Sequence, residues 1–320
     1  MLSVLKSRLD TEYRIIADIL DFIASPNRCS LQINRYDDYK ILSGQYQKQI
    51  EKIMVEQPEL NVNALKILTA DYAMKSVSLT GVEYIHFGKR RKLPNKPTLI
   101  MSATVFEDVY TYAYRYEKQT QFFNIDYVEN CGTLTQDLTY SFSKGNLTSH
   151  TDRNIDYIKE SIQARGKNPE DYTVITFKDS KNLFKKAGFN VAEDVHFGNS
   201  SGYNTLTGQN LIVVGTYHIP STDLKMYSLL LFDVILPEEE FEEVKMEDKK
   251  RYDINGVRLM FPSFDNPYVR ITQFYLLQSE LVQAVGRARL IRNPDTEVLL
   301  YSNFPVEEAD CYYHNTQLLF

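Results

Sequence analysis

The sequence QAVGRARLIR, Gln283–Arg292, has helical periodicity, and the apolar run EVLLYS follows it at Glu297–Ser302. Such a run is typical of a buried strand, and a helix that leads directly into a strand belongs to an α/β sheet. Gly286 is expected to let this helix pack closely against a neighbour. Arg287 and Arg289 add two guanidinium groups, which bind phosphate oxygens in pairs. The stretch therefore predicts an α/β fold with phosphate-binding side chains just before its last strand.

Upstream of this stretch, strand-like and helical patterns alternate from about residue 131. Strands are expected at 138–142, 172–177 and 211–218, and helices at 153–164 and 180–187. The turn-forming pair Asn255–Gly256, between strand-like flanks, predicts a hairpin. This order is typical of an open, mostly parallel sheet, so we expect one complete α/β domain over 131–320.

The first 130 residues have a different pattern, in which apolar residues recur mainly at three- and four-residue spacing. Helices are expected at 2–23, 36–56, 62–78 and 105–116, and strands at 82–87, 98–102 and 122–128. We therefore expect a helical segment over 1–81 and part of a further α/β domain over 82–130.

The composition excludes several classes of protein. The chain has 320 residues and a net charge of −6, so it is not a uniformly basic protein that coats nucleic acid. No apolar run approaches the ~18 residues of a membrane-spanning helix, and charged residues interrupt the N-terminus where a signal peptide would be apolar. The three cysteines, Cys29, Cys131 and Cys311, form no CxxC pair, so we expect no metal site, a cytoplasmic setting and no membrane partner.

Two motifs in order carry a resemblance to a known family. Ser102-Ala103-Thr104 directly follows the apolar run TLIM, and Q-x-x-G-R stands at Gln283–Arg287. Taken alone, the first motif is an ordinary strand-to-helix turn with Thr104 as the N-cap. Together they resemble motifs III and VI of the superfamily-2 helicases, whose core is two RecA-like domains. Residues 82–320 are covered by this resemblance, in which 131–320 is similar to the second, C-terminal RecA-like domain.

Looser similarities lie between these motifs. Thr173–Lys181, which includes Lys178, resembles motif IV, and Gly198–Asn204 resembles the motif V of DinG- and XPD-type helicases. That branch also has a helical insertion ahead of its motif III, similar to residues 1–81.

The resemblance implies a role for each matched residue. ATP would lie between the two RecA-like domains and face Gln283, Arg287 and Arg289, one arginine stabilising charge on the transferred γ-phosphoryl group. The remaining cleft or coupling positions are Ser102, Thr104, Gly202, Asn204 and Gly286. The family places its second motif VI arginine seven residues after the glutamine, where this chain has Leu290, so the choice between Arg287 and Arg289 stays open.

Two parts of an ATP site are missing from the sequence. It contains no GxxxxGK[ST] P-loop and no acidic run for Mg²⁺. The resemblance therefore implies that ATP and Mg²⁺ bind only in a complete helicase, with a P-loop-bearing N-terminal helicase half as partner. We expect this chain to be the C-terminal segment of an ATP-dependent helicase or translocase, inactive alone, as a truncated frame, a split subunit, a decayed copy or a regulator.

A nucleic-acid partner, most simply single-stranded DNA, is implied as well. Lys89, Arg90 and Arg91 form a basic loop that is either solvated or in contact with the phosphate backbone, and Lys178 belongs to the same expectation. Two alternatives stay open: a non-catalytic binding or adaptor module in a replication or defence assembly, and an unrelated α/β protein with accidental motifs. If the helicase reading holds, Arg287 and Arg289 are expected to be partly exposed and to lack an internal carboxylate partner.

Overall fold

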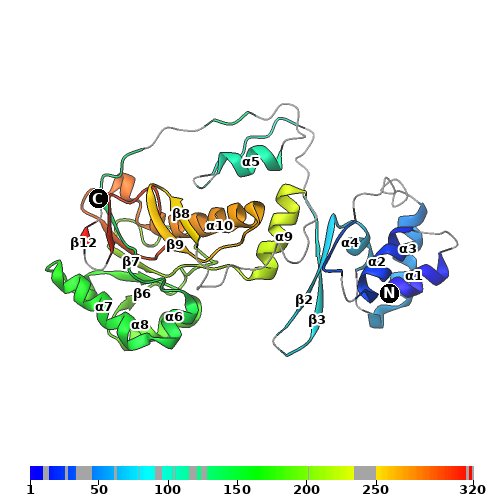
Figure 1. Cartoon of the computed structure of the whole chain (residues 1–320), viewed down its shortest axis with the longest axis horizontal. Helices are drawn as coiled ribbons and strands as arrows, with labels where there is room; N and C mark the ends of the chain where they lie inside the picture. Colours follow the sequence, from blue (N-terminus) through cyan, green and yellow to red (C-terminus); the bar gives the residue numbers. More distant parts are fainter. Residues whose placement is uncertain are drawn as a thin grey trace. The chain divides into compact units, whose positions relative to one another are not determined.

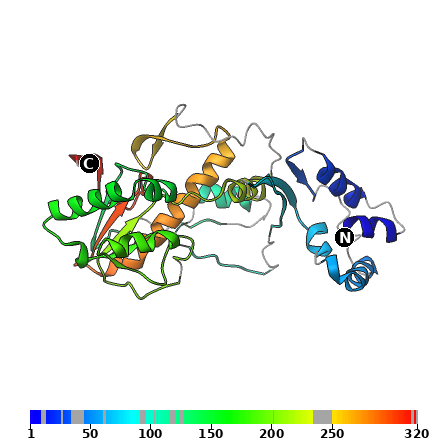
Figure 2. The same ribbon diagram turned by 90° about the horizontal axis from the view of Figure 1, so that it is seen from below.

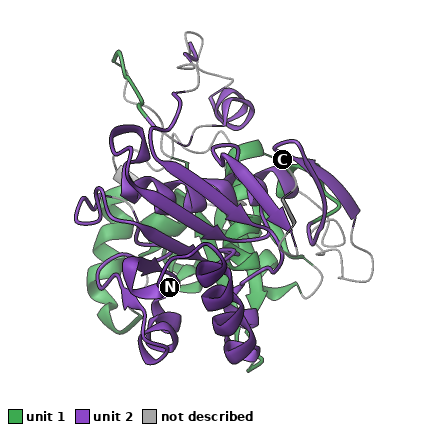
Figure 3. Cartoon of the chain, turned by 90° about the vertical axis from the view of Figure 1, so that its left-hand side faces the viewer, with its two compact units in different colours: residues 1–101, 220–243, 264–269 green, residues 102–219, 244–263, 270–320 purple. Residues whose placement is uncertain are grey.

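Packing divides the chain into two compact units, which Figure 3 colours separately. The computed structural model describes residues 1–9, 14–25, 28–33, 45–60, 63–78, 80–90, 96–102, 104, 106–114, 121–123, 128–200, 202–233, 250–314 and 317–318. Unit 1 comprises 1–101, 220–243 and 264–269, and unit 2 comprises 102–219, 244–263 and 270–320. The first segment of unit 1 ends at residue 101, between the divisions expected after residues 81 and 130, and the chain returns to unit 1 at 220–243 and 264–269.

Unit 2 is built on a seven-stranded sheet in the order β12-β11-β4-β10-β7-β5-β6. Its strands are β4 (Thr133–Asp137), β5 (Thr173–Ile175), β6 (Asn190–Val191), β7 (Leu211–Val214), β10 (Glu297–Tyr301), β11 (Cys311–His314) and β12 (Gln317–Leu318). All pair in parallel except β12, which is antiparallel to β11. The expected α/β fold with a mostly parallel sheet is confirmed.

Helices cover both faces of this sheet, as Figure 1 shows. One face carries α6 (Lys144–Ser149), α7 (Thr151–Ala164) and α8 (Lys181–Lys186), and the other carries α10 (Pro267–Val285) with the hairpin β8 (Lys250–Ile254)–β9 (Val257–Phe261). The hairpin turns at Asn255–Gly256, as the sequence predicts. Short 3-10 turns, η3 (Pro169–Asp171) and η4 (Lys178–Ser180), flank β5. Because both faces are covered, all four residues of β7 are fully buried, as the continuous apolar run LIVV requires.

The first strand of this sheet lies five residues earlier than expected. β4 is Thr133–Asp137, whereas Leu138–Phe142 follows it outside any strand. One Asp137 carboxylate oxygen accepts the backbone N–H of Thr139 at 2.9 Å, an Asx turn that ends the strand. The apolar content of 138–142 reflects burial of the turn, since Phe142 is fully buried with a left-handed φ of 46°.

Unit 1 combines helices with a three-stranded antiparallel sheet in the order β1-β2-β3. Its elements are α1 (Leu2–Arg8), α2 (Arg14–Ala24), β1 (Ser30–Gln32), α3 (Gln45–Glu56), η2 (Pro58–Leu60), α4 (Ala64–Leu68), β2 (Tyr72–Val77), β3 (Glu83–Gly88) and α9 (Ser221–Phe232). The expected helix over 62–78 is wrong beyond Leu68. Tyr72, Ala73 and Met74 are buried with β2 paired on both sides, so sheet pairing overrides the helical spacing.

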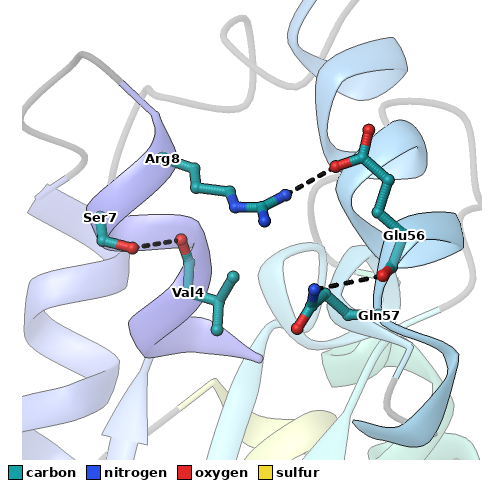
Figure 4. A network of polar contacts seen from close by, with 5 residues as sticks. All are labelled: Val4, Ser7, Arg8, Glu56 and Gln57. Carbon is teal, nitrogen blue, oxygen red and sulfur yellow. Dashed lines mark hydrogen bonds and ion pairs between the residues drawn. The ribbon is translucent and has the colours of Figure 1, made fainter.

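Polar contacts of unit 1 at its first helix are shown in Figure 4. The guanidinium of Arg8 lies 2.6 Å from a carboxylate oxygen of Glu56 and joins α1 to α3. Because both side chains are about two-fifths exposed, this pair contributes roughly 0–1 kcal/mol. The apolar side chains of α1 and α2, which include Leu5, Ile16 and Ile19, form the core beneath it.

The expected strand at 98–102 is not formed, and the one expected at 122–128 lies mostly outside the described residues. The apolar residues Leu99, Ile100 and Met101 are 82%, 46% and 83% exposed and lie in no strand. Phe123 and Val128 are likewise exposed and outside any strand, and 124–127 lie outside the described residues. None of the described strands pairs with the described residues of these segments, so no neighbouring strand accepts or donates hydrogen bonds to their backbone.

Candidate arginine site

The two motif VI arginines lie in a tight turn between α10 and β10. After α10 ends at Val285, the chain forms the 3-10 turn η7 (Gly286–Ala288) and then η8 (Leu290–Arg292), with Arg289 between them in the left-handed region at φ 57°. The left-handed conformation of Arg289 changes the direction of the chain. Arg287 therefore lies within the first 3-10 turn, and Arg289 lies just before the second. The Asn293 side chain donates to the carbonyl of Arg289 at 2.8 Å and stabilises this conformation.

Backbone hydrogen bonds from the residues that precede two other strands hold the turn in place. The N–H of Gly208, ahead of β7, donates to the carbonyl of Ala288 at 3.0 Å. The N–H of Gly132, ahead of β4, donates to the carbonyl of Leu290 at 3.0 Å. A Cβ at Gly132 would lie 2.4 Å from the backbone oxygen of Thr296, so only glycine permits this approach. The turn is therefore fixed to the sheet at the amino ends of its strands.

Arg287 is a buried arginine that bonds to the backbone. Its side chain Nε donates to the carbonyl of Gln283 at 3.0 Å, and Nη1 donates to the carbonyl of Tyr203 at 2.7 Å. The residue is only 9% exposed, which differs from the expected partial exposure. Burial lowers the pKa of its guanidinium, and the neighbouring charge of Arg289 lowers it further. Arg287 therefore acts as a clamp between α10 and the loop that contains Tyr203.

Arg289 is exposed, and its guanidinium forms one hydrogen bond to the residues that the structure describes. Its Nη2 donates to the Oδ1 of Asn204 at 3.0 Å. The loop 198–204 and the arginine turn are thus brought together. In the part of the chain that the structure describes, neither arginine forms an ion pair with a carboxylate. Two neighbouring positive charges without a counter-charge favour an anion.

The loop 198–204 has its own supports. The N–H of Gly198 donates to a carboxylate oxygen of Glu280 on α10 at 3.0 Å, which fixes the end of the loop remote from Arg287. Gly198 and Gly202 have φ of 80° and 83°, a conformation that excludes most other residues. Ser200 is buried, and its hydroxyl has no hydrogen-bond partner among the described residues.

Two further motif VI residues differ in their roles. Gln283 is partly exposed and receives the Arg287 side chain at its carbonyl. Gly286 was expected to allow close helix packing, but a Cβ there would meet no atom within 4 Å. The glycine instead leaves open space on the turn beside Arg287, so close packing does not explain it.

Ser102 and Thr104 dock along α10. The Thr104 N–H donates to the Ser102 hydroxyl at 3.3 Å, and the Thr104 carbonyl accepts the Ser279 hydroxyl at 3.4 Å. Ser279 precedes Arg287 by eight residues, about 12 Å along a helix. Thr104 is not an N-cap, because α5 (Glu107–Ala113) begins after Phe106 without a side-chain cap.

The helix that follows strengthens this docking. α5 lies beside α10 in Figures 1 and 2. The rings of Phe106 and Tyr110 both contact the ring of Tyr275 edge-on. The hydroxyls of Tyr110 and Tyr275 are 3.2 Å apart. Ala103 and Val105 lie outside the described residues.

The basic residues expected to contact nucleic acid lie in different units. In unit 1, Lys89 is exposed, whereas the guanidinium of Arg90 lies 2.7 Å from Asp233 and so already has an internal partner. Arg91 lies outside the described residues. In unit 2, Lys178 is exposed in η4, at the carboxyl end of β5.

Sequence reasoning missed the contacts that hold the site together. Tyr203 contributes only a carbonyl, which no side-chain pattern indicates. Gly132 lies beside the domain boundary expected after residue 130, and its observed role is close contact with the arginine turn. The neighbouring Cys131 thiol donates to the carbonyl of Ile291 at 3.1 Å.

Comparisons with known proteins leave the family open. No protein-family description, curated protein or solved structure matches this chain. Over the described ranges, no cluster of three metal-binding side chains is present, and no helix has the length and apolar character to cross a membrane.

Proposed function

We propose that unit 2 is the second RecA-like domain of an ATP-dependent helicase or translocase, and that it contributes its arginine turn to a composite ATP site. The observation that carries the proposal is the pair Arg287 and Arg289, which lie side by side without a carboxylate among the described residues. A site built for an internal ion pair would place an acid beside them. A site built for a phosphate in another domain leaves the charge uncompensated until that domain docks.

The geometry supports different roles for the two arginines. Arg289 is exposed, and among the described residues its guanidinium bonds to the Asn204 side chain, an exposed contact that it could exchange for a γ-phosphoryl group. Arg287 is held by the carbonyls of Gln283 and Tyr203 and positions the turn and the loop. Asn204 then keeps Arg289 in place before nucleotide arrives. ATP and Mg²⁺ themselves would be held by the P-loop-bearing partner.

A second contact supports a coupled site. Thr104 bonds to Ser279 on the helix that ends at the arginines, so a movement of the Ser102–Thr104 segment would be transmitted along α10. Both the Ser102–Thr104 segment and the arginine turn belong to unit 2, so this link would couple two candidate ATP-site segments within that unit.

The test is complementation. The chain is purified and mixed with the product of the neighbouring upstream reading frame, and steady-state ATP hydrolysis is measured with single-stranded DNA. We expect no turnover by either component alone and DNA-stimulated turnover by the mixture. Turnover by this chain alone, or none by a mixture that forms a complex, contradicts the proposal. The adaptor alternative gives the second of these results.

A further inference from the structure

Glu280 is an acid on α10 that lies close in sequence to the arginine turn. It forms an ion pair with none of the lysines or arginines that the structure describes. One of its carboxylate oxygens instead accepts the backbone N–H of Gly198 at 3.0 Å, a contact across 82 positions of the chain. A hydrogen bond to a charged acceptor is about twice as strong as one between neutral groups. Glu280 therefore contributes to the position of the loop 198–204.

This loop is held at both ends from α10 and the turn that follows it. Glu280 and Arg287 are seven residues apart, about two helical turns, so both can face the loop. Glu280 binds the start of the loop at Gly198, and Arg287 binds the carbonyl of Tyr203 near its end. Within the loop, the Asn199 side chain donates to the Tyr203 hydroxyl at 3.0 Å. These contacts link the start of the loop to its end.

The backbone at Gly198 fixes the direction of the N–H that Glu280 accepts. Gly198 has a left-handed φ of 80°, and a Cβ there would lie 3.2 Å from the hydroxyl of Tyr217. The position therefore favours glycine, and the loop leaves it in a defined direction.

We propose that Glu280 is a positioning residue, which holds the loop 198–204 in the conformation where Asn204 contacts Arg289. Asn204 is the last residue of this loop, and its Oδ1 accepts the Arg289 guanidinium at 3.0 Å. The contact between Glu280 and the loop is independent of any ligand, whereas its effect on a phosphoryl group rests on the proposed function. Loss of the contact would let the loop shift, and a displacement of about 1 Å in an active site can lower a rate about 10²-fold.

Nuclear magnetic resonance on the chain alone tests the contact. Glu280→Ala removes the acceptor, so we expect the Gly198 amide to exchange with solvent at least about tenfold faster. The side-chain amide signal of Asn204 should shift as it does in Arg289→Ala. Glu280→Gln keeps an acceptor oxygen and should restore both signals. The matched control Glu160→Ala removes an exposed acid of α7, on the other face of the sheet (Figure 1), and should change neither.

Two results on the chain alone would overturn the proposal. One is an unaltered exchange rate at Gly198 in Glu280→Ala. The other is an Asn204 signal that does not move in this variant.

ATP hydrolysis by the complex with the upstream product measures the effect on the site. We expect Glu280→Ala to lower kcat about 10–100-fold with little change in KM, and Glu280→Gln to stay within about threefold of the unaltered rate. Because Glu280 acts through Asn204, the double variant Glu280→Ala/Asn204→Ala should lose no more than Asn204→Ala alone. Losses that multiply in the double variant would contradict this order of action.

The outcomes separate this inference from the proposed function. An unchanged kcat for Glu280→Ala, in a complex that hydrolyses ATP, overturns the positioning role and leaves the proposed function in place. A complex that forms without hydrolysis contradicts the proposed function, and the resonance measurements on the chain alone then decide the role of Glu280.

Discussion

Two strand-like runs of the same length, LIVV at 211–214 and TLIM at 98–101, differ completely in their surroundings. The first is a fully buried strand between β10 and β5, and the second lies in no strand with its side chains exposed. Local sequence predicts a strand for both. The difference shows that a strand is completed by its neighbours, because backbone hydrogen bonds and coverage come from other segments. Unit 2 supplies them to 211–214, and no described strand supplies them to 98–101.

The largest expected effect compares one charge in each run. Val213→Asp buries a carboxylate in the covered sheet, so we expect a loss of more than about 4 kcal/mol of unfolding free energy. Leu99→Asp places the same group in water and should change it by less than about 0.5 kcal/mol. Urea denaturation followed by circular dichroism measures both. Equal losses of unfolding free energy for the two variants would show that residues 98–101 are already covered in the isolated chain. This result would contradict the difference described between the two runs.

A second prediction uses two glycines of the arginine turn region. Gly132→Ala drives a Cβ into the Thr296 backbone oxygen, which should cost about 1–3 kcal/mol by overpacking. Gly286→Ala enters open space and should be neutral or stabilising by up to about 1 kcal/mol. Thermal melts of the two variants decide the question, and a larger loss at Gly286 would contradict the packing described here.

A third, smaller difference separates the two arginines. Arg287→Ala leaves the carbonyl of Tyr203 without its charged donor, so we expect a loss of about 1.5–3 kcal/mol. Arg289→Ala removes an exposed side chain and should cost less than about 1 kcal/mol. Chemical denaturation of both variants is the measurement. An equal loss of unfolding free energy for Arg289→Ala and Arg287→Ala would contradict the different roles given to the two arginines.

Much of the α/β fold follows from local sequence. Periodicity gives α7, β7 and β10, and the pair Asn255–Gly256 gives the hairpin, because these signals agree with their surroundings. The failures share one cause. β2 was assigned to a helix and 98–102 to a strand, and in both places distant pairing decides the outcome.

The candidate site was predictable in its side chains but not in its backbone partners. The spacing of Gln283, Arg287 and Arg289 draws attention to the guanidinium groups, whereas the bond between Arg289 and Asn204 comes from the structure. The exposure of each arginine depends on which carbonyls lie nearby. No sequence signal gives the carbonyl of Tyr203 or the close approach of Gly132.

The central claim is that Arg289 acts on a phosphoryl group held by a partner domain. Its most direct test is steady-state ATP hydrolysis by the assembled complex, with Arg289→Ala compared against Arg292→Ala, an exposed neighbour on the same turn. We predict that Arg289→Ala lowers kcat by about 10³-fold or more with little change in KM, while Arg292→Ala retains the unaltered rate. Equal rates for the two variants in a complex that hydrolyses ATP would contradict the claim.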